Sequence, residues 1–117
     1  MVDVAAEAAR AVPLQVSAAG GNRYTVRGSL NFATARRACD TGLRAFAAAA
    51  DHAPLELDCS GIGSVDSAGL AVLIAWAAWA QRQGRRIQFS HLPEALLALA
   101  RISEAEGLLQ APSVGGS

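Results

Sequence analysis

A serine stands at the start of an apolar helix in this chain, within the segment Asp66-Ser67-Ala68-Gly69. The segment follows Leu55–Cys59, a run typical of a strand, and precedes a longer apolar run from Leu70 to Ala80. The first amides of a helix have no partners within it, and the helix dipole is positive there. The Ser67 hydroxyl can therefore cap the helix, or it can carry a phosphate that meets these amide donors.

The residues next to Ser67 leave both uses open. A capping box would place Glu or Gln at position 70, where this chain has Leu70. Gly69 costs about 1 kcal/mol relative to alanine in a helix, so its presence indicates close packing or close approach by another molecule. Asp66 can position Ser67, accept hydrogen bonds from loop amides, or simply interact favourably with the helix dipole.

The remaining polar residues form no recognisable catalytic or metal-binding set. His52 and His91 are isolated, and Ser67 has no His or Lys nearby in sequence. The chain has no Walker loop and no GxGxxG motif. Cys39 and Cys59 are expected to be buried, reduced thiols. We therefore expect a protein that is not an enzyme and that has no cofactor and no metal site.

Two further clusters have alternative explanations. Arg82, Arg85 and Arg86 lie at a helix end, where cations suit the dipole, although they could also bind a phosphate or a lipid head group. Trp76 and Trp79 are adjacent on the surface of one helix. They belong either to the core or to an interface with another protein.

Composition restricts the class of protein. The chain has 117 residues, which suits one domain, with 52% hydrophobic residues and a formal net charge of zero. A neutral charge does not indicate nucleic-acid binding. The N-terminus lacks a basic signal sequence, and the longest apolar run, Ala68 to Ala80, is too short to span a membrane. We expect a cytoplasmic protein.

The elements that position Ser67 follow from hydrophobic periodicity. Pro13–Ser17 and Arg23–Leu30 alternate and are joined by a glycine-rich turn, which predicts an antiparallel hairpin. Asn31 is expected to cap a helix from Phe32 to about Ala50, in which Gly42 is a local weakness. The outer face of that helix carries residues four apart that can pair weakly: Arg36, Asp40 and Arg44.

The second half of the chain alternates strands with helices. The strand Leu55–Cys59 is followed by a loop containing Gly61 and Gly63, and then by a helix from Ser67 to about Gln83. A strand over Arg85–Ser90 and a third helix from about Pro93 complete the order β-β-α-β-α-β-α. This predicts an α/β fold with a small mixed sheet of about four strands and helices mainly on one face.

Three segments carry a family resemblance: Gly28–Ala35, Leu55–Ser60 and Val65–Leu70. Together they resemble the STAS domain, the fold shared by anti-sigma factor antagonists and sulfate-transporter tails. The resemblance covers residues 13–109. It leaves residues 1–12 as a flexible or helical leader and residues 110–117 as a disordered tail.

The last third of the chain resembles the MlaB type of STAS domain, through Gln83–Phe89, Pro93–Ala100 and Leu108-Leu109. Such proteins are cytoplasmic subunits of the ABC transporter that moves phospholipids between the bacterial membranes. The resemblance implies a non-enzymatic subunit that docks on the transporter's ATPase and regulates it. The protein would then lie at the inner membrane only indirectly, through its partner.

The resemblance also implies which residues meet the partner: Asp66, Ser67, Ala68, Gly69 and Leu70. In anti-sigma factor antagonists the serine after the aspartate is phosphorylated by a partner kinase, so a switch operated by phosphorylation of Ser67 is the alternative function. A sulfate-transporter tail is a third. Many family members carry acids where this chain has Ser29 and Asn31, so any contact made by those acids is absent here.

Overall fold

The computed structural model describes residues 12–49 and 54–103, so the predicted tail, and the leader apart from Val12, lie outside the described residues.

The two segments in which apolar and polar residues alternate form the predicted hairpin. Strand β1 (Gln15–Ala18) pairs antiparallel with β2 (Arg23–Leu30). On β2, Tyr24 and Val26 are buried, Thr25 between them is half-buried, and the flanking arginines, Arg23 and Arg27, are exposed. One face of the hairpin therefore packs on the core and the other faces outwards.

Helix α2 (Ala35–Ala47) begins later than predicted, and Asn31 does not cap it. The capping position belongs to Thr34, whose side chain makes no capping bond. Gly42 is required by the packing, because the indole ring of Trp76 occupies the space that a side chain at position 42 would need. The pairing expected among residues 36, 40 and 44 is also absent, since the ion pairs among the described residues lie elsewhere.

Strand β3 (Leu55–Val65) is more than twice as long as the predicted Leu55–Cys59, because Gly61 and Gly63 lie in the strand rather than in a loop. The pairing of β2 with β3 is parallel and shifts register twice, as β-bulges do. A side chain at Gly61 would come within 2.8 Å of Arg27 Cγ. This glycine therefore marks a close approach of two strands rather than the end of one.

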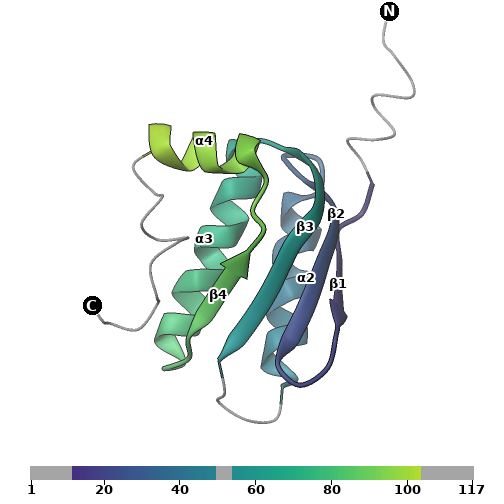
Figure 1. The fold of residues 1–117 in the computed structure, drawn as a ribbon, viewed down its shortest axis with the longest axis vertical. Helices are drawn as coiled ribbons and strands as arrows, with labels where there is room; N and C mark the ends of the chain where they lie inside the picture. The colour runs from purple at the N-terminus through teal and green to yellow at the C-terminus, as the bar shows by residue number, and fades with distance from the viewer. Residues whose placement is uncertain (1–11, 50–53, 104–117) are drawn as a thin grey trace, which may run out of the picture.

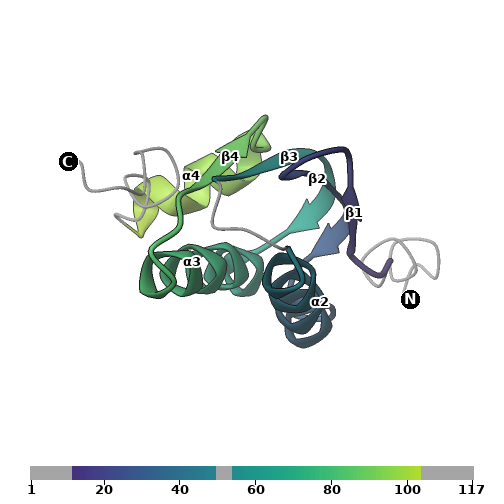
Figure 2. The same cartoon turned by 90° about the horizontal axis from the view of Figure 1, so that it is seen from below.

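The remaining elements complete the predicted order. Helix α3 (Ser67–Arg82), strand β4 (Ile87–Ser90) and helix α4 (Glu94–Ile102) follow β3. The sheet has the order β1-β2-β3-β4, with parallel pairing between β3 and β4. Helices α2 and α3 lie against one face, while α4 lies near the end of the sheet (Figures 1 and 2). The predicted mixed α/β fold is confirmed.

An aromatic cluster joins α2 and α3 to the sheet. The ring of Phe46 meets Tyr24 edge-on at 5.5 Å and Trp76 edge-on at 5.4 Å between centroids. Trp76 is fully buried and donates from Nε1 to the Cys39 carbonyl oxygen. Trp79 is half-buried and tilts against Phe46. The two tryptophans therefore differ in burial: Trp76 lies in the core and Trp79 lies at its margin.

No helix among the described residues is long and apolar enough to cross a membrane.

Candidate functional site

The ends of two neighbouring strands bring the predicted site together. Strands β2 and β3 are parallel, and Leu30 lies opposite Val65 in the register. The residues that follow each strand, Phe32 after β2 and Asp66 after β3, therefore emerge at the same edge of the sheet (Figure 1). We call this region, residues 31–34 with residues 64–68, the strand-end edge.

Asp66, rather than Ser67, caps helix α3. Its Oδ1 accepts a hydrogen bond from the Gly69 amide at 3.1 Å, and its Oδ2 accepts one from the Phe32 amide at 3.0 Å. One carboxylate therefore closes the start of the helix and holds the neighbouring turn against it. The possibility that Ser67 is the cap is wrong, because a carboxylate one residue earlier already fills that role.

The structure separates the five predicted contact residues into two groups. Ser67 is exposed, and Asp66 and Ala68 are half-buried. Gly69 and Leu70 are buried, and a side chain at position 69 would collide with the carbonyl oxygen of Leu30. Only the first three can touch a partner directly, while Gly69 and Leu70 fix the helix against β2.

The turn before α2 is tied to the site by the side chains of Asn31, predicted to cap a helix, and of Thr34, for which no role was predicted. Asn31 donates from Nδ2 to Ser64 Oγ at 2.9 Å, and its Oδ1 accepts from the Ala33 amide at 3.0 Å. Thr34 Oγ1 donates to the Ser29 carbonyl oxygen at 2.7 Å. Asn31 and Thr34 are buried, so the turn is a fixed part of the fold.

A shallow hollow of ≈ 460 Å³ lies on the strand-end edge. Phe32 lines it and is 85% exposed, which makes it a large apolar side chain in water beside the start of α3. The helical pattern predicted that Phe32 lies inside the helix. The signal that could have found it is the capacity of Asn31 to fold back on the backbone two residues later. The hollow is lined by Asn31, Phe32, Ala33, Ser64, Val65 and Asp66.

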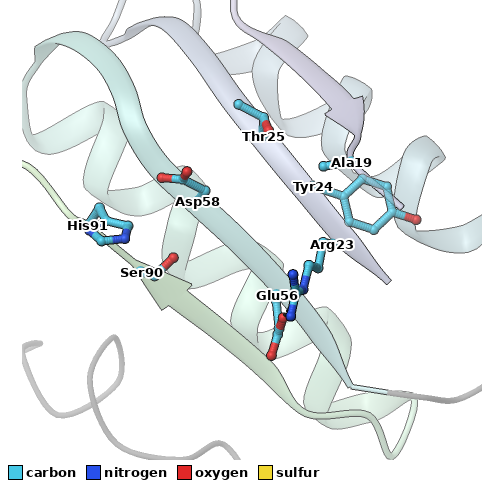
Figure 3. Close-up of a pocket in the computed structure, with 8 residues that line it drawn as sticks. All are labelled: Ala19, Arg23, Tyr24, Thr25, Glu56, Asp58, Ser90 and His91. Carbon is cyan, nitrogen blue, oxygen red and sulfur yellow. Dashed lines mark hydrogen bonds and ion pairs between the residues drawn. The ribbon is translucent and has the colours of Figure 1, made fainter. Parts of the chain in front are cut away.

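A second hollow, of ≈ 420 Å³, lies on the face of the sheet opposite α2 and α3 (Figure 3). Arg23 and Glu56 form an ion pair across it at 3.0 Å, and both side chains are more than half exposed. Hydrogen bonds from Ser60 lower the pKa of Asp58, and His91 lowers it further. Charged groups on this face are therefore paired with one another, as Arg23 and Glu56 are, or stabilised by hydrogen bonds, as Asp58 is.

The arginine cluster is not brought together as one site. Arg85 is buried and donates from Nη1 to the Phe46 carbonyl oxygen at 3.1 Å, whereas Arg82 and Arg86 are exposed. The cluster therefore includes a structural residue that joins the β4 side of the fold to α2. Within residues 12–49 and 54–103, no three His, Cys, Asp or Glu side chains gather as a metal site would require.

Both cysteines are free, and Cys59 is buried as expected, whereas Cys39 is only half-buried. Burial raises the pKa of Cys59 to about 12, and it also raises the pKa of the half-buried Cys39. Thiolates are the reactive form of cysteine, so neither thiol is activated for chemistry.

Comparison with known proteins gives a family and a fold. The sequence profile of the family described as "Mlab, STAS domain" matches residues 6–110. Among solved structures, the anti-sigma factor antagonist SpoIIAA in its unphosphorylated form is similar, with a TM-score of 0.57 and 11% sequence identity. The similarity covers 76% of this chain and 82% of that one. No curated protein sequence matches the chain.

Proposed function

The chain belongs to the MlaB-type STAS domain family, and we propose that it docks on the ATPase of a phospholipid-transport ABC complex and regulates it. STAS domains are generally binding and regulatory domains, and they meet partners such as kinases or ATPases. The proposal assigns the strand-end edge and the adjoining helix α3 to that contact. Localisation at the inner membrane would then follow from the partner.

The observation that carries the proposal is the exposed Ser67 on a rigid support. Asp66 holds the turn and the helix start with two hydrogen bonds, while Gly69 and Leu70 are packed inside. A surface that is already ordered loses little conformational entropy when it binds. This is the property expected of a permanent docking surface.

The outward side of α3 continues this surface. Ala71 is exposed, and Ala75 and Ala78 are half-buried, at helical spacings that place them on one side with Ser67. Small side chains allow another backbone to approach closely. These three alanines form an apolar stripe of small side chains. A partner helix packed along this stripe would bury apolar area without having to accommodate large side chains.

The hydrogen bonds at the helix start favour a neutral Ser67 over a phosphorylated one. The Gly69 amide, a donor that a phosphate on the first turn could use, already donates to Asp66. A phosphate on Ser67 would also add about −1.5 to −2 charges beside that carboxylate. Repulsion and competition for the amide both oppose it.

The alternative function is an anti-sigma factor antagonist switched by phosphorylation of Ser67. The exposure of Ser67 favours it, because a kinase could reach the hydroxyl. The fold shared with SpoIIAA is compatible with it, although at 11% identity the likeness concerns the fold alone. In this alternative the partner is an anti-sigma kinase.

Copurification with the ATPase subunit tests the proposal. Ser67→Ala should retain the ATPase, because the contact is neutral and small. Ser67→Glu should lose it, while its thermal melt changes little, because the attraction of the helix start for an acid offsets repulsion from Asp66. Equal retention by both variants would contradict docking at this surface. A phosphorylated fraction in the intact mass of the native protein that vanishes in Ser67→Ala would favour the switch instead.

A further inference from the structure

Phe32 is the most unusual surface residue of the strand-end edge. At 85% exposure it is the most exposed large hydrophobic side chain among the described residues. Exposed phenylalanine rings in water lose the stabilisation that burial would give, about 2 kcal/mol for such a side chain. An isolated exposed apolar residue needs no explanation by itself. The surroundings of Phe32 supply further observations.

The backbone of Phe32 is fixed where it stands. Its amide donates to Asp66 Oδ2 at 3.0 Å, and the preceding Asn31 is buried and bonded to Ser64. The next amide, that of Ala33, donates to Asn31 Oδ1. An aromatic ring on a rigid turn is preorganised for insertion into a partner, because little freedom remains to be lost. Phenylalanine, like the other large aromatic residues, is enriched in protein interfaces relative to the rest of the surface.

Two arginines stand next to this turn. Arg36 and Arg37 occupy the first turn of α2, which contains no acidic residue, and both are exposed. Cations are disfavoured at the positive end of a helix. Neither arginine forms an ion pair among the described residues, and Asp40, one turn further on, forms none with Arg36. The charge arrangement is therefore unfavourable in the isolated domain, and a partner's carboxylates would correct it.

From these observations we propose that Phe32 is the anchor of the partner interface and that Arg36 and Arg37 form its charged rim. The occupant is a partner protein whose surface has an apolar socket for the ring, bordered by Asp or Glu residues. This inference rests on the proposed function, since the partner is taken to be the transporter's ATPase. It adds a specificity determinant on α2 to the contact at Ser67.

A protein socket fits this surface better than a membrane does. Membrane-surface binding through charge uses clusters of about four to eight basic residues, and the formal net charge of this chain is zero. One aromatic ring inserted into lipid gives weak binding, as even a whole acyl chain does. Two arginines beside a single fixed ring match one socket with an acidic border.

The experiment measures the dissociation constant between the full-length chain and the purified ATPase subunit of the host's phospholipid-transport complex. Phe32→Ala should weaken binding at least about 30-fold, because an anchor residue is involved. Its thermal melt should not move, because the ring contacts mainly water. Ile102→Ala is the matched control, since Ile102 is 81% exposed on α4. It should change binding by less than about twofold.

The rim is tested by charge reversal. Arg36→Glu combined with Arg37→Glu should weaken binding about tenfold or more and should reduce the dependence of binding on salt. Arg86→Glu is the control for a charge reversal elsewhere and should have little effect, because this exposed residue precedes β4 at the opposite end of the sheet from the strand-end edge.

The possible results separate this inference from the proposed function. If the unmodified chain fails to bind the ATPase, the proposed function and this inference both fail. If Ser67→Glu loses the ATPase while Phe32→Ala binds normally, only this inference fails. It also fails if Phe32→Ala and Ile102→Ala weaken binding equally. Size-exclusion chromatography and sedimentation with anionic phospholipid vesicles test two other occupants. Self-association or vesicle binding that disappears in Phe32→Ala would overturn the protein socket.

Discussion

The hollow on the strand-end edge and the hollow on the outer sheet face have similar volumes and opposite organisation. On the strand-end edge, a single carboxylate and two buried polar residues hold the backbone, and the exposed side chains of Ser67 and Phe32 form no hydrogen bond or ring contact with other described residues. On the outer sheet face, the exposed groups are charged and interact with each other, as Arg23 and Glu56 do. Rigid backbone with unengaged side chains suits recognition, whereas mutually paired side chains suit a solvated face.

The largest expected effect concerns the support of the strand-end edge. Gly69→Ala should lower the free energy of unfolding by about 3 kcal/mol or more, because the added methyl group collides with backbone at Leu30. Chemical denaturation measures the loss. Gly63→Ala is the matched control, because the nearest atom to its added methyl group is 3.9 Å away, at ordinary contact distance. Equal stability of the two variants would show that the helix start is not packed as described.

A second, smaller effect should follow from removing the carboxylate. Asp66→Ala loses the cap of α3 and the bond to the Phe32 amide, which together stabilise the fold by about 2 kcal/mol. Asp66→Asn keeps one acceptor and should lose about half as much. Hydrogen exchange of the Phe32 and Gly69 amides should accelerate in Asp66→Ala. Unchanged exchange at Phe32 would mean that the turn is not held by this side chain.

The smallest effect is expected on the outer sheet face. Glu56→Ala breaks the ion pair with Arg23, but both side chains are largely in solvent. Exposed pairs contribute about 0–1 kcal/mol, so the loss should be within about 0.5 kcal/mol. A double-mutant cycle with Arg23→Ala measures the coupling. A coupling as large as the Asp66 effect would remove the contrast between the two faces.

The sequence predicted the fold well, because hydrophobic periodicity specifies the order of strands and helices. The sequence-based prediction was wrong where the role of a residue depends on contact with a residue far away in the sequence. Gly61 was predicted to lie in a loop. Its close contact is with Arg27, 34 positions away, and local sequence does not show that contact. Gly42 was predicted only to weaken its helix. Its role in packing is set by the indole ring of Trp76 on another helix, which fills the space beside it. Such pairings are decided by tertiary packing, which local pattern does not encode.

The site was predicted in part for the same reason. The segment around Ser67 was found because a helix start and its acid are adjacent in sequence. Phe32 was assigned to a helix, since only the fold shows that the Asp66 carboxylate holds the Phe32 amide across 34 positions. The exposure of Ser67 and the burial of Leu70 likewise depend on which side of α3 meets the sheet, and nearly every position of that helix is apolar.

The most direct test of the central claim compares one added negative charge on each region. The measurement is the dissociation constant from the purified ATPase subunit for Ser67→Glu and for Ser17→Glu, both made at exposed serines, the second on β1. An unpaired charge buried at an interface costs about 2–5 kcal/mol, so Ser67→Glu should bind at least about 30-fold more weakly than the unmodified chain. Ser17→Glu should bind normally. Loss of binding in Ser17→Glu with normal binding in Ser67→Glu would contradict the account and place the partner on the outer face of the sheet.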